Sequence, residues 1–283
     1  MTTMKNNLTL KIAAAFLVFA AAVGFVFAPA ETITVKGSDT MVQLAQRWAE
    51  KYMQQHPEVN IQVTGGGSGT GISALINGTT DVCDASRPMK DAEKIKLRER
   101  YGSTGIEIRS AKDGLTVYLN EGNSVKELSF DQIRGIYTGK IKNWKDVGGS
   151  DAAIILYGRE NNSGTYVFFK ERVLNNEDYA SSTQTLPGTA AVVNAVSHDP
   201  NGIGYGGAGY AKGIKECLVK LTDSDPSYLP TAENVASGKY PITRFLYIYL
   251  RQKPTGALQD YIKWILGAEG QGIVKNAGFF PVR

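Results

Sequence analysis

Hydrophobic residues along this chain follow two periodicities in turn, one typical of strands and one typical of helices. Residues 32–37, TITVKG, alternate apolar and polar positions and are rich in β-branched side chains, which predicts a strand. From about residue 41 to residue 55, apolar residues recur at helical spacing and would form one face of a helix. These apolar residues are Met41, Leu44, Ala45, Trp48 and Tyr52.

The same succession of strand and helix continues towards the C-terminus. We expect further strands at about 59–65, 113–120, 154–159 and 240–250. We expect further helices at about 68–77, 91–100, 129–139, 166–174, 189–197 and 257–266. Strands that alternate with helices favour an α/β fold with parallel sheets.

The chain of 283 residues is long enough for two lobes, and no long linker separates its halves. We therefore expect two lobes joined by crossover strands. The first lobe would comprise residues 31–112 together with 218–283, and the second lobe residues 113–217.

The N-terminus follows neither pattern. Lys5 and Lys11 precede an apolar run over residues 12–27, and Ala-Pro-Ala follows at 28–30. A basic start, a short apolar run and a small-residue site are typical of a secretory signal peptide, here residues 1–30. The alternative is a membrane anchor, for which the run is rather short. The sequence thus predicts export to the periplasm, with cleavage after Ala30.

Charge and composition exclude some partners. Removing residues 1–30 takes away two lysines and no acid, which lowers the formal net charge from +4 to +2. Because no stripe of Lys and Arg with interleaved aromatic residues is present, we expect no nucleic acid partner. The histidines, His56 and His198, lack ligand spacing, so the sequence predicts no metal and no cofactor. Cys83 and Cys217 leave a disulfide and two buried thiols equally open.

Three strands run into a glycine, serine or threonine and then into a helix. The segments are GSDT at 37–40, GSGT at 67–70 and NSGT at 162–165. The first turn of a helix has unsatisfied N–H groups and a partial positive charge, so it binds anions. One such start would be an ordinary helix cap. Three starts with the same chemistry indicate a converging anion site.

Two arginines lie close to these segments. Arg159 precedes Ser163 by four residues, and Arg87 follows Ser86 in the loop DASRP. A guanidinium group makes forked hydrogen bonds to oxyanions. The alternative for each arginine is a salt bridge at the surface.

A nucleotide site fits the same glycine-rich segments poorly. TGGGSGTG at 64–71 lacks the Lys-Ser/Thr of a P-loop. GIGYGGAGYA at 202–211 matches G-x-G-x-x-G, but it lies late in the chain and opens no obvious helix. We therefore favour a site for a small anion.

At these residues the sequence resembles the phosphate-binding proteins of bacterial ABC transporters for phosphate uptake. The matching segments occur in the family's order and span almost all of the chain after residue 30. They are GSDTM, GGGSGTG, DVCDASRPM, GRENNSGT, GIGYGGAGY and YPITRFLYIYL. The resemblance implies a two-lobe periplasmic-binding fold of type II, which closes on one phosphate in the interlobe cleft. It also implies a monomer without enzymatic activity that delivers phosphate to a membrane permease.

The resemblance carries over to individual residues. Arg159, Ser163, Gly164 and Thr165 fall on the family's Arg and Ser-Gly-Thr ligands, and Ser68 falls on the serine of its glycine-rich loop. Asp39 and Thr40 fall on the family's first binding loop. The candidate phosphate-binding residues are Ser38, Asp39, Thr40, Ser68, Ser86, Arg87, Arg159, Ser163, Gly164 and Thr165.

Arg87 is a departure from some members of the family, which have an aspartate there. Phosphate carries a proton at neutral pH and sulfate does not, so a buried acceptor can separate the two anions. Arginine cannot accept a hydrogen bond. We expect Asp39 to supply the acceptor, with Asp84 as the second candidate; otherwise Asp39 would be an ordinary helix cap.

Other functions remain as alternatives. A phosphatase would need a nucleophile with a base, or a metal cluster, and neither histidine lies within a hydroxyl-bearing loop. The same fold could serve as a phosphate-sensing or adhesive module. It could also bind another tetrahedral oxyanion, such as arsenate, sulfate or molybdate.

Overall fold

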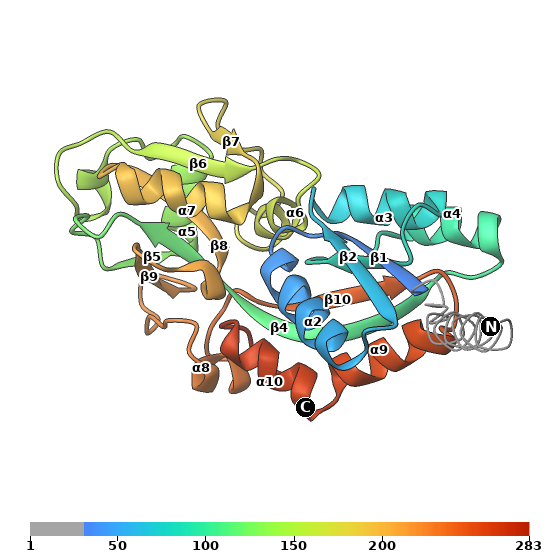
Figure 1. Cartoon of the computed structure of the whole chain (residues 1–283). Coiled ribbons are helices and arrows are strands. Elements are labelled where there is room, and N and C mark those ends of the chain that lie inside the picture. Colours follow the sequence, from blue (N-terminus) through green and yellow to red (C-terminus); the bar gives the residue numbers. More distant parts are fainter. Residues whose placement is uncertain (1–30, 283) are drawn as a thin grey trace, which may run out of the picture.

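The computed structural model describes residues 31–282, and the predicted signal peptide at 1–30 lies outside this part of the chain (Figure 1). Within residues 31–282, no helix is both long and apolar enough to cross a membrane. The described chain forms two lobes side by side, joined by the long strand β4 (Ile106–Leu119).

The first lobe is a five-stranded sheet covered by helices on both faces. Its strand order is β2 (Val59–Thr64), β1 (Glu31–Gly37), β3 (Val82–Ala85), β10 (Thr243–Leu250) and β4. The first three strands are parallel, while β10 runs antiparallel to both of its neighbours. One face packs against α2 (Val42–Gln55), α9 (Gly256–Leu266) and α10 (Ala268–Asn276). The other face packs against α3 (Ser68–Asn77) and α4 (Asp91–Tyr101).

The second lobe is built on the far end of β4. Residues 115–119 of β4 pair with β8 (Gly202–Gly207), and residues 117–119 also pair with β9 (Lys215–Lys220). Strand β8 continues to β6 (Ile155–Arg159) and β7 (Gln184–Leu186), and β9 pairs with β5 (Glu127–Ser129). The helices are α5 (Phe130–Tyr137), α6 (Gly164–Arg172), α7 (Gly188–His198) and α8 (Ala232–Ala236), with short 3-10 turns at Trp144–Val147 and Ala208–Tyr210.

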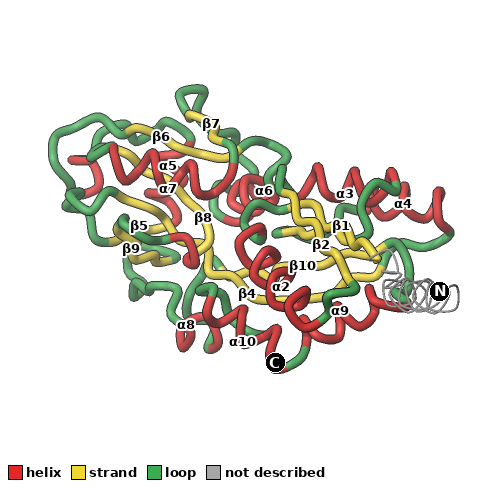
Figure 2. The backbone as a smooth tube through the Cα atoms, in the orientation of Figure 1, coloured by secondary structure: helices red, strands yellow, loops and turns green. Residues whose placement is uncertain are grey.

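Strand β4 serves both lobes, as Figure 2 shows by its continuous path between the two groups of strands. Its residues 106–114 pair with β10 and its residues 115–119 pair with the second lobe. The expected boundary at residue 113 therefore lies close to the crossing point. The expected boundary at residue 217 falls inside β9. The packing of Val219, Val235 and Ile242 in the second hydrophobic core extends that lobe to residue 242.

The two cysteines lie in different cores. Cys83 of β3 packs beneath α3 and α4, while Cys217 of β9 packs in the second lobe. Both are free, buried thiols, which resolves the open alternative against a disulfide between them. Burial raises the pKa of Cys217 to about 12, so this thiol stays protonated and unreactive at neutral pH.

Candidate functional site

Two of the three hydroxyl-bearing segments meet across the boundary between the lobes. The N–H of Gly69, in the first turn of α3, donates to the carbonyl of Asn162 at 2.9 Å. The Asn162 side chain donates in turn to the carbonyl of Gly66 at 3.0 Å and to Thr70 Oγ1 at 3.1 Å. The glycine-rich loop of the first lobe and the NSGT segment of the second lobe are therefore in direct contact.

The third segment, at 37–40, joins them through its hydroxyl groups. Thr40 Oγ1 lies 2.8 Å from Thr165 Oγ1, which belongs to the second lobe. Ser38 Oγ donates to Ser86 Oγ at 2.9 Å, and Ser86 Oγ lies 3.3 Å from Ser68 Oγ. All of these hydroxyls are buried. Buried polar groups are unfavourable unless they are hydrogen-bonded, and here the hydroxyls satisfy one another. Together they form a cluster of hydroxyl groups, contributed by both lobes, that can bind a polar ligand.

Gly164 explains how the start of α6 approaches this cluster. A Cβ atom at this position would lie 2.3 Å from Ser68 Oγ and 2.6 Å from Ser86 Oγ, so only glycine fits. The preceding Ser163 caps α6 by accepting hydrogen bonds from the N–H groups of Thr165 and Tyr166. The start of α3 follows Gly67, which offers no side-chain cap. The positive ends of both helices thus lie next to the hydroxyl cluster.

Arg159 lies at the end of β6 and is 1% exposed. Its Nη2 is 2.6 Å from Asp39 Oδ2 in the other lobe, and its Nη1 donates to Thr189 Oγ1 at 3.1 Å. Its Nε is buried and has no hydrogen-bond partner among residues 31–282. The ion pair lowers the penalty of burying the guanidinium, and it links the two lobes.

Asp39 is not a helix cap. Helix α2 begins at Val42 with Met41 as its N-cap, and no side chain caps it. The Asp39 carboxylate instead accepts from Arg159 through Oδ2 and from the N–H of Gly66 through Oδ1, at 2.8 Å. Its main-chain carbonyl accepts a hydrogen bond from the Tyr210 hydroxyl at 2.8 Å. The structure therefore brings Asp39 to the site for a reason other than capping.

Arg87 is bound elsewhere. Both arms of its guanidinium pair with the Glu93 carboxylate of α4, at 2.7 and 2.8 Å, and Nη1 also donates to the carbonyl of Pro88. Burial raises the pKa of Glu93, but the hydrogen bonds from Arg87 and from the N–H of Lys90, together with the charges of these two residues, outweigh burial and lower that pKa. None of the Arg87 hydrogen bonds goes to the hydroxyl cluster. Arg87 thus forms a salt bridge, as in the alternative considered for it, but the salt bridge is buried and not at the surface.

Sequence reasoning missed Arg244 and Asp113. They are direct cross-strand partners on β10 and β4, where the chain crosses between the lobes. Arg244 donates to Asp113 Oδ2 through Nε at 3.0 Å and Nη2 at 2.8 Å. It also donates to Thr165 Oγ1 at 3.0 Å and to the carbonyl of Ser86 at 3.1 Å. The segment YPITRFLYIYL contains this arginine, but no local pattern indicates its partner.

Asp84, the second candidate acceptor, lies on β3 two residues before Ser86. Burial raises the pKa of its carboxyl group to about 7. Among residues 31–282, no hydrogen bond to this carboxylate is seen, so nothing links Asp84 to Arg159 or to the serine hydroxyls.

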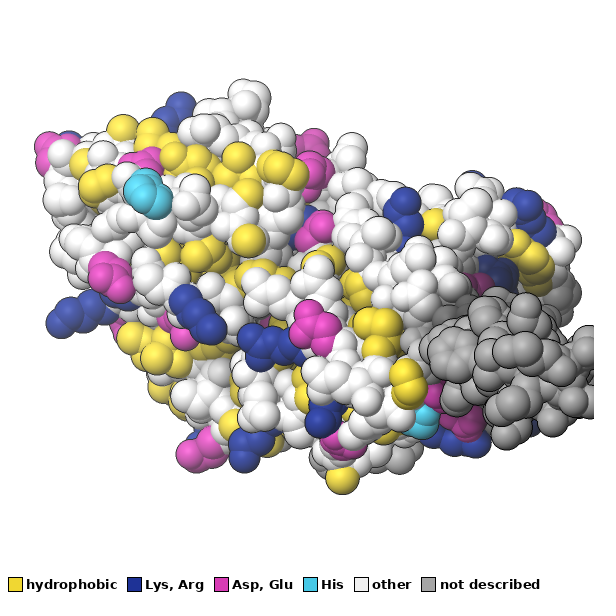
Figure 3. Space-filling model, viewed as in Figure 1, with side chains coloured by type: hydrophobic (Ala, Val, Ile, Leu, Met, Phe, Trp, Pro, Cys, Tyr) yellow, Lys and Arg dark blue, Asp and Glu magenta, His cyan; other side chains and the backbone are white. Residues whose placement is uncertain are grey.

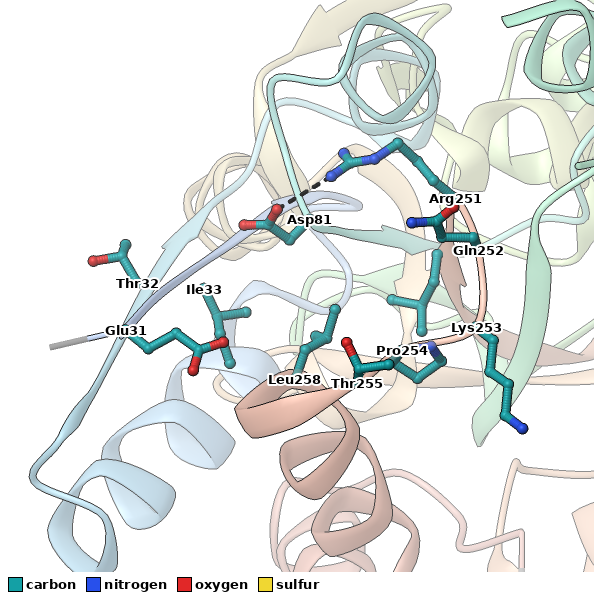
Figure 4. A pocket seen from close by; sticks show the side chains of 11 residues that line it. Glu31, Thr32, Ile33, Asp81, Arg251, Gln252, Lys253, Pro254, Thr255 and Leu258 are labelled. Atoms are coloured by element: carbon teal, nitrogen blue, oxygen red, sulfur yellow. Dashed lines mark hydrogen bonds and ion pairs between the residues drawn. The ribbon is translucent and has the colours of Figure 1, made fainter. Parts of the chain in front are cut away.

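A pocket at the outer end of the first lobe is lined by residues such as Glu31, Asp81, Arg251 and Lys253, and it contains none of the predicted residues (Figure 4). Basic and acidic side chains are interspersed on the face seen in Figure 3. His56 lies beside Glu58, and His198 beside Ser197, so neither histidine reaches the hydroxyl cluster. The arrangement can bind an oxyanion, but it offers no histidine as a base.

Comparison with known proteins agrees with this chemistry. The sequence profile of the PBP superfamily domain matches residues 28–269. The phosphate-binding protein PstS of Pseudomonas aeruginosa is 33% identical over 263 residues, which cover 87% of this chain and 81% of that protein. The protein of the same name from Staphylococcus epidermidis is 35% identical over 253 residues, covering 86% of this chain and 77% of its own length.

Solved structures give the same picture. A protein of Clostridium perfringens, assigned as a phosphate ABC transporter substrate-binding protein and solved with bound phosphate, superimposes with a TM-score of 0.81 at 29% identity. The match covers 89% of this chain and all of that one. An ABC-type phosphate transport receptor from Vibrio cholerae has a TM-score of 0.70 at 29% identity, covering 88% of this chain and 99% of its own.

Proposed function

Because the chain belongs to the PBP superfamily and, within it, to the family of PstS phosphate-binding proteins, we propose that it binds inorganic phosphate between its two lobes and delivers it to an ABC transporter permease. The observation that carries this proposal is the meeting of the α3 and α6 starts beside the buried Arg159. Each helix start favours negative charge, and Arg159 adds a full positive charge. The site has the donors that a tetrahedral oxyanion requires.

The proposed contacts come from both lobes. Hydroxyl and N–H donors of the first lobe come from the segment at 38–40 and the start of α3, and those of the second lobe from α6. Arg159 supplies the charge. We leave the Arg87 side chain out of the contact set, because Glu93 already occupies its guanidinium. The side chains and N–H groups proposed to contact phosphate are those of Ser38, Asp39, Thr40, Ser68, Ser86, Arg159, Ser163, Gly164 and Thr165.

Asp39 is proposed to accept a hydrogen bond from the protonated oxygen of phosphate. Each oxygen of an ionised carboxylate has two lone pairs, and Arg159 and Gly66 each use one of them. A further lone pair is therefore available to a protonated oxyanion. Sulfate has no proton, so it would place an unprotonated oxygen against the carboxylate. Arsenate carries a proton as phosphate does, and this contact would not reject it.

Closure of the lobes supplies the mechanism. The Arg159–Asp39 ion pair and the contacts of Asn162 form only when the lobes are together. A phosphate that bonds to both lobes favours this state, because it makes all of its bonds there and nowhere else. Exclusion of water strengthens each charged hydrogen bond. The closed monomer, exported after cleavage of residues 1–30, would then be the form that the permease recognises, without any covalent step.

The test is a calorimetric titration of the purified protein, stripped of ligand by partial unfolding, with phosphate and with sulfate. The proposal predicts saturable binding of one phosphate and no measurable heat from sulfate. A companion experiment deletes the gene and measures phosphate uptake at low phosphate concentration. Binding without loss of uptake would favour the sensing module over transport, and absence of binding would contradict the proposal itself.

A further inference from the structure

Arg244 lies at the interlobe boundary, and no role has been given to it above. It is buried in the described structure, and all of its hydrogen bonds go to groups around the proposed phosphate site. Asp113 holds it on one side, and Ser86 of the first lobe accepts from Nη1. On the other side it reaches the second lobe, where Nη2 donates to Thr165 and the guanidinium lies 5.4 Å from the ring centroid of Phe168.

The hydroxyls of Thr40 and Thr165 raise a problem for anion binding. Their oxygens are 2.8 Å apart, so one of the two protons lies between them. A hydroxyl has a single proton, and a proton spent on the neighbouring threonine is not available to an anion. If both protons pointed to an anion instead, two oxygens at hydrogen-bond distance would face each other through their lone pairs.

Arg244 can remove this conflict. Its Nη2 lies 3.0 Å from Thr165 Oγ1 and 3.5 Å from Thr40 Oγ1, and a guanidinium group only donates. One Nη2 proton goes to Asp113 Oδ2. The other is directed at the two hydroxyl oxygens and can occupy the lone pairs that they would otherwise turn towards each other. Both hydroxyl protons are then free to point at the same ligand.

We propose that Arg244, anchored by Asp113, is a positioning residue that makes Thr40 and Thr165 donate together to the bound phosphate. The inference rests on the proposed function, and it adds two residues that the Ser-Gly-Thr pattern does not include. Asp113 fixes the guanidinium by two bonds to one oxygen and lies opposite Arg244 on the neighbouring strand. Because Thr40 and Thr165 belong to different lobes, the same contact ties hydroxyl orientation to closure.

The test is a double-mutant cycle of Arg244→Lys and Thr165→Val, read by calorimetric titration with inorganic phosphate. Lysine keeps the charge beside Asp113 but lacks the fork that holds Asp113 and the hydroxyl oxygens at once. Each single variant is expected to bind phosphate about 10-fold more weakly. In the Thr165→Val background, Arg244→Lys should weaken binding by no more than about threefold further, because its effect passes through the missing hydroxyl.

Arg251→Lys is the matched control. Arg251 follows β10 directly and pairs with Asp81 at 3.3 Å, at the outer pocket of the first lobe (Figure 4). The Arg251→Lys substitution should leave phosphate affinity unchanged, both in the unmodified protein and in the Thr165→Val variant. If Arg244→Lys does not fold, Asp113→Asn takes its place in the cycle with the same expectation.

Two outcomes overturn the inference in distinguishable ways. Additive losses, about 100-fold in the double variant, mean that Arg244 does not act through Thr165. That result leaves phosphate binding by the unmodified protein intact. Failure of the unmodified protein to bind phosphate removes the proposed function, and the inference with it.

Discussion

Arg159 and Arg87 each lie beside a serine-bearing loop, but the structure uses them in opposite ways. Arg159 pairs with Asp39, which is 120 residues away and belongs to the other lobe. Arg87 pairs with Glu93, which is six residues away in the same lobe. Both guanidinium groups are almost fully buried. The ion pair of Arg159 can therefore change when the lobes separate, whereas that of Arg87 stays within one rigid unit.

The difference identifies which arginine an anion can influence. A ligand shifts a conformational equilibrium only through contacts that differ between its states. The Arg159–Asp39 pair is such a contact, because its partners lie on the two sides of the cleft. The Arg87–Glu93 pair joins β3's loop to α4 and stabilises the first lobe whether or not an anion is bound. Four predictions follow this contrast from ligand binding to stability.

The largest effect is expected from Arg159→Gln. The substitution removes the buried positive charge and leaves Asp39 facing the anion without its counter-charge. Phosphate affinity should fall at least about 100-fold, as for other truncated partners of buried charge pairs. Calorimetric titration measures the loss, and circular dichroism checks the fold. A variant that binds phosphate normally would remove Arg159 from the site.

A smaller loss is expected from Asp39→Asn. Asparagine keeps the shape and one carbonyl acceptor, but it removes the charge and places an amide where an acceptor stood. Phosphate affinity should fall about 30-fold, and sulfate should begin to bind. Parallel titrations with the two anions give the ratio directly. Asp81→Asn, which alters a carboxylate at the outer pocket, is the matched control. If the ratio of phosphate to sulfate affinity did not change in Asp39→Asn, another group would have to accept the hydrogen bond from the phosphate proton.

Arg87→Gln should affect stability and leave binding almost unchanged. The variant leaves the partly exposed Glu93 carboxylate without its arginine partner, so the free energy of unfolding should fall by about 2 kcal/mol at neutral pH. The pKa of Glu93 is lowered in the folded protein, so its stabilising effect is present at neutral pH and is lost as acid protonates it. The difference from the unmodified protein should thus shrink at low pH. Denaturant unfolding at pH 7 and pH 3 measures it, and a large loss of phosphate affinity would contradict the assignment.

Asp84→Asn is expected to change the stability of the protein, and the change depends on pH. The folded pKa of about 7 lies above the ordinary value of 3.8, so the folded protein holds a proton that the unfolded chain releases. Burial of the charge therefore lowers stability progressively as the pH rises from about 4 to 7. Without phosphate, Asp84→Asn should be more stable than the unmodified protein by about 4 kcal/mol at pH 8 and nearly equal at pH 4. If the variant and the unmodified protein were equally stable at both pH values, the Asp84 carboxylate would be solvated or paired, which contradicts the raised pKa.

The sequence predicted the parts of this molecule that local chemistry determines. The apolar face of α2 and the helix that follows NSGT were expected from spacing and from the hydroxyl-bearing start, and both are present. The capping residue of α2 was not, because Asp39 binds Arg159 and Met41 takes the N-cap position. Strand β4 begins at Ile106 and not at 113, since pairing with β10 extends it through charged and polar residues.

The features that were missed depend on partners far away in the chain. Arg244 and Asp113 are 131 residues apart and meet only because β10 and β4 are neighbours. The second lobe extends past residue 217 because β9 adds to the edge of β4, which no periodicity indicates. The pairing of Arg87 with Glu93 could have been predicted from the sequence. Glu93 follows Arg87 by six residues and lies in the first turn of the predicted helix, within reach of the arginine side chain.

We expect one phosphate to lie between the lobes, bound by Arg159 and not by Arg87. A crystal structure of the protein with phosphate tests it most directly. The anion should lie between the starts of α3 and α6, in contact with Arg159 and with Thr40 and Thr165, while Arg87 remains paired with Glu93. A phosphate bound by a reoriented Arg87, or bound outside the interlobe boundary, would contradict it.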